Sequence, residues 1–218
     1  MSQTQAHSRR LVGRPGHNAG MTFPPEPLSA DEVSRLCAAM TQGALGDRNR
    51  AAIALMYRAG LRLAEALALH PSDVDGDAKT VRVLKGKGGK FRVVGIDAEG
   101  LLHIERWLVR RRDHAIPKSA PLLCQLDGTP WAPQAVRRVL TDAGKRAGIT
   151  KRVHPHGLRH SHAVRLDEAG VRTSLISRQL GHSSLAVTSI YLDHVSPAQL
   201  VQALDGVAFD AEPAEDAA

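Results

Sequence analysis

The sequence predicts a mainly α-helical chain with one small antiparallel β-sheet, an α+β fold. Apolar residues recur at helical spacing along most of the 218 residues. One stretch, residues 79–96, instead alternates with a period of two around a Gly-rich turn. The composition, 43% hydrophobic but only 3% aromatic, is that of a globular protein with a Leu/Ala/Val core. The length favours a single domain.

The chain begins with a segment that we expect to be a flexible basic arm. Residues 1–27 are polar and Gly/Pro-rich and contain three arginines, so they offer little apolar surface to bury. Order is expected from Leu28, because Ser29 or Asp31 can cap a helix. The apolar face of that helix would contain Val33, Leu36 and Met40.

Two more helices and a hairpin are expected next. Residues 47–60 read as a core helix ended by Gly60, and residues 61–70 as a short helix stopped by Pro71. The alternating segments KTVRVLK and KFRVVGI flank GKGG, which predicts a hairpin. Its tip would present Lys87 and Lys90.

The second half of the chain is expected to be helical. The pattern predicts helices at about 98–112, 133–147, 157–169 and 173–180, with further ones starting near Ser184 and after Pro197. Residues 206–218 are acidic and Ala-rich, which indicates a disordered tail. The predicted organisation is therefore an arm (1–27), one domain (28–205) and a tail (206–218).

The charge distribution favours a polyanionic partner. The net charge is +7, but five acids and no base lie in the last 14 residues, so residues 1–204 carry 29 bases against 17 acids. Nucleic acid is the commonest partner of such a surface, although a merely solvated basic surface stays an alternative. The longest apolar run, residues 51–57, is too short to cross a membrane, and no secretory signal is visible. We therefore expect a cytoplasmic protein with no membrane partner. In such a protein the two cysteines, Cys37 and Cys124, are expected to be buried thiols.

Four short stretches place a cation or a hydroxyl at an element boundary. They are GLRLAEAL, LKGKGGKFRVV, HPHGLRHSHA and QLGHSSLAVTSIYL, and their polar residues are Arg62, Lys87, His156, Arg159, His182 and Tyr191. His156 and Arg159 are three apart, so they share a face of a helix. No comparable cluster of Asp, Glu or Cys is present to hold a metal.

This set of residues suits phosphodiester transfer without a metal ion. Two guanidiniums, Arg62 and Arg159, could stabilise the charge on the non-bridging oxygens of the transition state. A leaving 5′-alkoxide needs a proton, which Lys87 could donate as general acid. The phenol of Tyr191 has an ordinary pKa of about 10 and needs help to act as a nucleophile. His156 is the candidate base, and His182 a second donor to the phosphoryl oxygen.

The four stretches resemble the signature of the tyrosine recombinase (phage integrase) family. GLRxxE is similar to its first-arginine box, GKGxK to its hairpin-lysine box, HxLRH to its His-Arg box, and LGHxS…TxxY to its final His and Tyr box. They occur in the order of the family, and the match extends over about residues 28–204.

The resemblance implies a fold, a reaction and partners. The fold would be that of the family's catalytic domain, without a full N-terminal core-binding domain. Tyr191 would form a 3′-phosphotyrosyl link to double-stranded DNA and leave a free 5′-hydroxyl, with no metal, ATP or other cofactor. Members act as tetramers in which the C-terminal segment of one protomer packs on its neighbour, here residues 197–204. The expected protein is a site-specific recombinase or integrase of a mobile element, acting with or without a helper protein.

Alternative interpretations stay open at this stage. The chain could be a DNA-binding integrase fragment or accessory module that no longer recombines, or a metal-dependent nuclease. Tyr57 lies on an apolar helix face and is expected in the core.

Other polar residues also allow two readings. The run of His154, His156, His160 and His162 invites a zinc reading, but these four do not share a helix face. We expect His160 to pack or hydrogen-bond behind the site. Glu65 could fix a guanidinium or be a solvated helix residue. About half of a second set of cations should contact the phosphate backbone: Arg110, Arg111, Arg112, Lys145, Arg146, Lys151 and Arg152.

Overall fold

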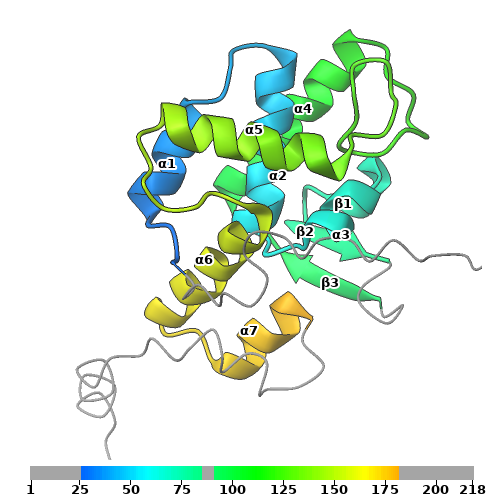
Figure 1. The fold of residues 1–218 in the computed structure, drawn as a ribbon. Coiled ribbons are helices and arrows are strands. Elements are labelled where there is room, and N and C mark those ends of the chain that lie inside the picture. The colour runs from blue at the N-terminus through cyan, green and yellow to red at the C-terminus, as the bar shows by residue number, and fades with distance from the viewer. Residues whose placement is uncertain (1–25, 85–90, 182–218) are drawn as a thin grey trace, which may run out of the picture.

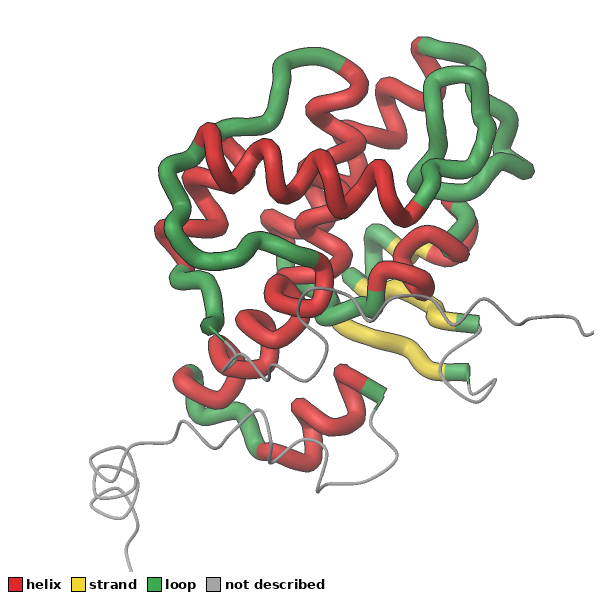
Figure 2. Tube along the Cα trace, in the orientation of Figure 1, coloured by secondary structure: helices red, strands yellow, loops and turns green. Residues whose placement is uncertain are grey.

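The structure is a computed structural model that describes residues 26–84 and 91–181 (Figure 1). Its helices are α1 (Ala30–Ala38), α2 (Ala44–Tyr57), α3 (Leu63–Ala68), α4 (Ala98–Asp113), α5 (Pro133–Arg146), α6 (Pro155–Glu168) and α7 (Thr173–Leu180). A 3₁₀ turn at Pro71–Asp73 leads into strand β1 (Val74–Asp75), followed by β2 (Thr80–Val83) and β3 (Arg92–Gly95). The predicted class, mainly α with a small antiparallel sheet, is confirmed (Figure 2).

The three-stranded sheet contains the predicted hairpin and one strand that the sequence pattern did not predict. β2 and β3 are antiparallel, with Val81 opposite Val94, and both valines are buried. β1 pairs with the other edge of β2 over only two residues, Val74 and Asp75. A strand of two residues is too short to show alternation in sequence. The hairpin tip, with Lys87 and Lys90, lies outside the described residues.

Helix α2 forms the centre of the core and packs against α4 and α6. Its residues from Ala51 to Met56 are all at most 2% exposed, which explains why this segment is apolar on every side. It begins at Ala44, earlier than the expected start near Asp47, and Gly43 occupies the N-cap.

The predicted capping of α1 by Ser29 is found. The Ser29 side chain accepts a hydrogen bond from the Glu32 backbone N–H, and the Glu32 carboxylate accepts one from the Ser29 backbone N–H.

Helices α6 and α7 start and end close to the predicted positions. α6 starts at Pro155, two residues before the expected position, because His154 caps it by accepting a hydrogen bond from the Gly157 N–H through Nδ1. α7 ends at Leu180, and the next residue, Gly181, has a φ of +64°, the left-handed conformation that glycine adopts at a helix end. The helices expected after residue 181 lie outside the described residues.

The two cysteines are both free, and one differs from expectation. Cys124 is buried, as predicted, but Cys37 is only partly buried. Burial still raises the pKa of the Cys37 thiol to about 11. No helix among residues 26–84 and 91–181 is long and apolar enough to cross a membrane.

Candidate active site

Three of the six predicted site residues line a single pocket of about 340 Å³. Arg62 comes from the N-terminal end of α3, and His156 and Arg159 from the first two turns of α6. The remaining three, Lys87, His182 and Tyr191, lie outside the described residues. The pocket thus has a cationic wall, to which the N-terminal ends of α3 and α6 both contribute.

Arg159 is almost completely buried, at 1% exposure. Its guanidinium donates to the carbonyl of Gly60 at 2.5 Å and to that of Leu180 at 2.6 Å. These bonds join α6 to the turn before α3 and to the end of α7. Gly60 has a φ of +66°, and a β-carbon there would lie 2.5 Å from the His162 ring, so this close approach requires glycine.

Arg62 is held by Glu65 one turn further along α3. The Arg62 guanidinium donates to Glu65 Oε1 at 2.9 Å, and the Arg62 backbone N–H donates to Oε2 at 2.9 Å. Glu65 is only 5% exposed. Of the two readings left open by the sequence, Glu65 is therefore a partner that fixes a guanidinium, while Arg62 keeps 31% of its side chain exposed toward the pocket.

Glu65 is the negative centre of the site. Its carboxylate also accepts two hydrogen bonds from Arg92 on β3 and lies 3.8 Å from Arg159. Burial alone would raise its pKa, but the bonds from Arg92 and Arg62 outweigh this effect and lower the pKa to about 2. Glu65 is therefore ionised at neutral pH. Arg92 was not among the predicted site residues, since a single arginine in a strand carries no signal of its partner.

His156 is exposed at the rim of the pocket, next to the ring of His154 at a centroid distance of 6.4 Å. Partial desolvation and the charges of Arg159 and Arg62 lower the pKa of His156 below its ordinary 6.5. The neutral imidazole is thus the favoured form at pH 7, which is the form that can accept a proton.

Two further arginines extend the cationic rim. Arg152, one of the predicted phosphate contacts, and Arg137 on α5 both line the pocket and are exposed. Arg137, which lies on the polar face of α5, was not among the residues predicted from the sequence. The position of that face over the site is a tertiary feature that periodicity does not show.

The other predicted phosphate contacts are divided. Arg111 is 4% exposed and donates to backbone carbonyls of the 117–122 loop, so it does not count toward the half of this set that was expected to contact phosphate. Lys151 binds Glu32 and the Pro27 carbonyl. Arg110 and Arg146 are exposed but bind Asp47 and the Ala39 carbonyl. Arg112 and Lys145 are exposed.

The histidine run of α6 gives no sign of a metal centre. In the described ranges, no three His, Cys, Asp or Glu side chains are placed to hold a metal ion. His154 caps its helix, and His160 and His162 are buried at 2% and 6% exposure.

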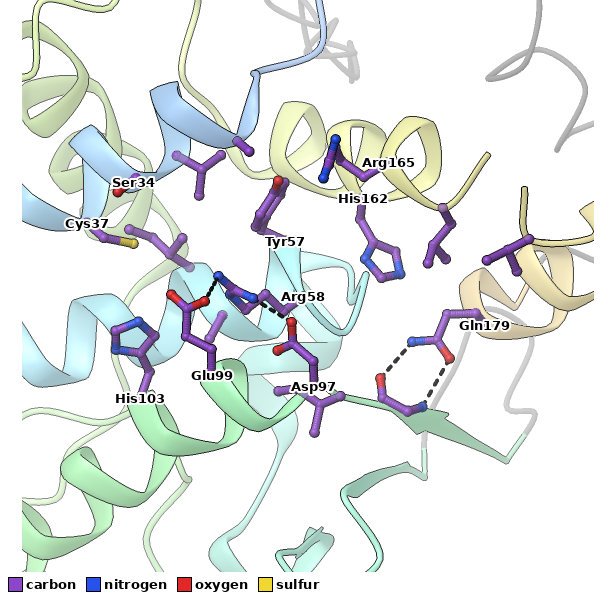
Figure 3. Close-up of a pocket in the computed structure, with 18 of the residues that line it drawn as sticks. Ser34, Cys37, Tyr57, Arg58, Asp97, Glu99, His103, His162, Arg165 and Gln179 are labelled. Atoms are coloured by element: carbon purple, nitrogen blue, oxygen red, sulfur yellow. Dashed lines mark hydrogen bonds and ion pairs between the residues drawn. The ribbon is translucent and has the colours of Figure 1, made fainter. Parts of the chain in front are cut away.

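A larger pocket of about 660 Å³ lies elsewhere, between α1, α2, α4, α6 and α7 (Figure 3). Tyr57 lines it and is 9% exposed, which confirms its expected place in the core. On one wall Arg58 binds both Asp97 and Glu99, as the dashed lines show. His162 also lines this pocket, and burial lowers its pKa to about 4. Of the predicted site residues that the structure describes, Arg62, His156 and Arg159, none lines this pocket.

Comparison with known proteins places the chain in a family. The model of the phage integrase family matches residues 26–197. Tyrosine recombinase XerD of Mycobacterium tuberculosis is 37% identical over 179 residues, covering 77% of this chain and 56% of that protein. Tyrosine recombinase XerC of Xanthomonas campestris is 37% identical over 167 residues, covering 77% of this chain and 51% of that protein. The chain thus spans about half the length of these relatives.

Solved structures agree with the sequence relatives. The crystal structure of XerA recombinase has 31% sequence identity and a TM-score of 0.71, covering 86% of this chain and 67% of that one. XerH site-specific recombinase bound to its difH substrate has 26% identity and a TM-score of 0.69, covering 84% of this chain and 55% of that one. The resemblance read from the four motifs is confirmed, and the chain belongs to the phage integrase family.

Proposed function

We propose that this chain is a site-specific DNA recombinase that breaks and rejoins strands through a 3′-phosphotyrosyl intermediate on Tyr191. The observation that carries the proposal is the pocket in which Arg62, Arg159 and His156 meet. The guanidiniums of Arg62 and Arg159 come from different helices and carry permanent charge, which suits a phosphodiester whose non-bridging oxygens gain charge in the transition state.

The chemistry follows from the residue types. The Tyr191 oxygen attacks the scissile phosphorus, forming an O–P bond as the bond to the 5′-oxygen breaks. The phenol proton passes to a base, for which neutral His156 is our candidate. Lys87 protonates the departing 5′-oxygen, and His182 donates to a phosphoryl oxygen. Reversal of these steps with a 5′-hydroxyl from another strand completes the exchange, and because the phosphotyrosyl bond retains the energy of the diester, the reaction consumes no ATP.

The partners in this proposal are double-stranded DNA and further copies of the chain. XerH is a site-specific recombinase solved bound to its difH substrate, which supports DNA as the ligand here. We propose a tetramer on DNA in which residues 197–204 pack on a neighbouring protomer. A chain lacking residues 197–218 should then fail to form the synaptic complex in a gel shift while still binding single sites. Unimpaired synapsis would contradict this role.

The decisive experiment is a covalent trapping assay with the full chain. Nicked duplexes carrying candidate inverted repeats from the flanking DNA serve as suicide substrates, because the small fragment beyond the nick diffuses away after cleavage. We expect an SDS-resistant protein–DNA adduct that forms in EDTA. Tyr191→Phe should abolish it.

The chain supplies its own matched control, since Tyr57 and Tyr191 are its two tyrosines. Tyr57→Phe removes a phenol from the wall of the larger pocket and should still form the adduct. If specific DNA binding occurs without an adduct, the chain is instead a DNA-binding module. If cleavage requires a divalent ion, it is a nuclease.

A further inference from the structure

Within the described residues three arginines interact with Glu65, and Arg92 on β3 is the second most buried of them, after Arg159. Its side chain is 12% exposed, and its two terminal nitrogens donate to the two oxygens of Glu65 at 2.9 and 2.8 Å. This is the bidentate geometry in which a guanidinium fixes the plane of a carboxylate. Arg92 therefore determines how the carboxylate of Glu65 is turned.

The orientation of that carboxylate matters because two pocket arginines depend on it. Glu65 Oε1 accepts from Arg62, and Glu65 Oε2 lies 3.8 Å from Arg159. One negative charge is thus shared among three guanidiniums. Arg92 and Arg62 each use both oxygens: Arg92 donates one bond to each, while Arg62 donates to Oε1 from its guanidinium and to Oε2 from its backbone N–H.

Arg92 also contacts the end of α7. Its Nε donates to the Gln179 carbonyl at 3.4 Å, and a β-carbon on Gly181 would lie within 2.8–2.9 Å of its side chain. The Gln179 side chain fastens the same helix to β3 by accepting from the Gly95 N–H and donating to the Gly95 carbonyl. Arg92 therefore stands where β3, α3 and the last turn of α7 meet.

We propose that Arg92 is a positioning residue: by binding both oxygens of Glu65, it holds Arg62 and Arg159 at the spacing needed to grip one phosphate. This inference rests on the proposed function for its biological meaning, but its physical content is the anion affinity of the pocket. Arg92 touches no substrate in this scheme and acts through Glu65.

The test separates positioning from charge with the variant Arg92→Lys. Lysine keeps the positive charge but donates as a point and cannot hold a carboxylate plane. In the full chain, inorganic phosphate is titrated while the Nε–Hε NMR signals of Arg62 and Arg159 are followed. We expect the dissociation constant to rise about tenfold in Arg92→Lys, since misplacement of a binding group by about 1 Å is costly.

Two further variants control this measurement. Arg82→Gln removes an arginine from the neighbouring strand β2 that binds the Ser72 carbonyl and is outside the Glu65 cluster, so it should leave phosphate affinity nearly unchanged. Glu65→Gln is combined with Arg92→Lys in a double-mutant cycle. If Arg92 acts through Glu65, the lysine substitution has little further effect once the carboxylate is gone. Thermal unfolding verifies that each variant is folded at the titration temperature.

The outcomes distinguish this inference from the proposed function. Two results would overturn the inference even if the Tyr191 adduct forms. One is that Arg92→Lys binds phosphate with wild-type affinity. The other is that the NMR signals of Arg62 and Arg159 do not shift when phosphate is added to the wild-type chain. A tenfold loss of affinity that is additive with Glu65→Gln would overturn the route through Glu65. Conversely, the expected cycle in a chain that forms no adduct would leave the inference standing and refute the recombinase.

Discussion

Arg111 and Arg159 are both buried arginines whose guanidiniums bind backbone carbonyls, yet they do different things. Arg111, on α4, is surrounded by carbonyls of one loop and by the Cys124 sulfur, and it lines neither of the two pockets described above. Arg159, on α6, binds carbonyls from two distant segments, lies 3.8 Å from a carboxylate, and borders the candidate site. Burial of an arginine therefore does not identify function, whereas its position against a cavity does.

The largest effect that we predict separates these two arginines by activity. Arg159→Ala should slow adduct formation on the suicide duplex by about 10²- to 10³-fold, comparable with losing one oxyanion donor. Arg159→Lys, which retains a charge in the buried position, should still be strongly impaired because it loses the planar fork. The single-turnover rate measures the effect, with DNA affinity followed separately. A near-normal rate in both variants would refute the cationic clamp.

The reverse is expected for Arg111. Arg111→Met leaves the carbonyls of Pro117, Ala120 and Pro121 without this donor, which should lower the free energy of unfolding by about 2–3 kcal/mol. Urea denaturation measures this loss. Adduct formation below the melting temperature should stay at the wild-type rate, and a selective loss of activity in the folded variant would return Arg111 to the DNA interface.

These two residues show which features of the fold and of the site can be predicted from sequence patterns. Helical period, Gly stops and the GKGG turn predicted the elements because those signals are local. Motif spacing selected Arg62, His156 and Arg159, which do line one pocket. Three adjacent arginines on α4, in contrast, look alike in sequence, and which of them turns inward depends on the packing of a loop several residues away.

The negative centre of the site shows the same limit. Glu65 was a candidate because it lies one turn from Arg62, a local relation. Arg92 escaped notice because its bond to Glu65 spans 27 positions and depends on how β3 docks against α3. β1 was missed for a different reason, since a two-residue strand exists only through its partner.

A third prediction concerns the pH dependence of stability and rests on His162, which lines the larger pocket. The pKa of His162 is lowered to about 4 by burial, so between pH 4 and 6.5 the unfolded chain binds the extra proton and the folded chain does not. The stabilisation is complete above pH 6.5 and is lost as the pH falls. We expect the His162 contribution to the unfolding free energy to fall by about 2 kcal/mol from pH 7 to pH 5.

His162→Gln tests this assignment, because glutamine does not titrate. The variant should show a shallower fall in stability than the wild-type chain, whereas His114→Gln, at an exposed position after α4, should keep the wild-type slope. Equal slopes in all three chains would show that His162 is not the group responsible.

The smallest predicted effect belongs to Arg58, the arginine of the larger pocket. It binds Asp97 and Glu99 at 2.5 Å, but those carboxylates keep 55% and 62% of their side chains exposed. A double-mutant cycle of Arg58→Gln and Glu99→Gln should therefore give a coupling energy below about 1 kcal/mol, which 1 M salt screens further. The Arg92–Glu65 pair, whose carboxylate is 4% exposed, should instead resist salt. Equal coupling energies for Arg58–Glu99 and Arg92–Glu65 in high salt would contradict this prediction. Solvent exposure would then not explain the difference between surface ion pairs and the buried ion pairs of the site.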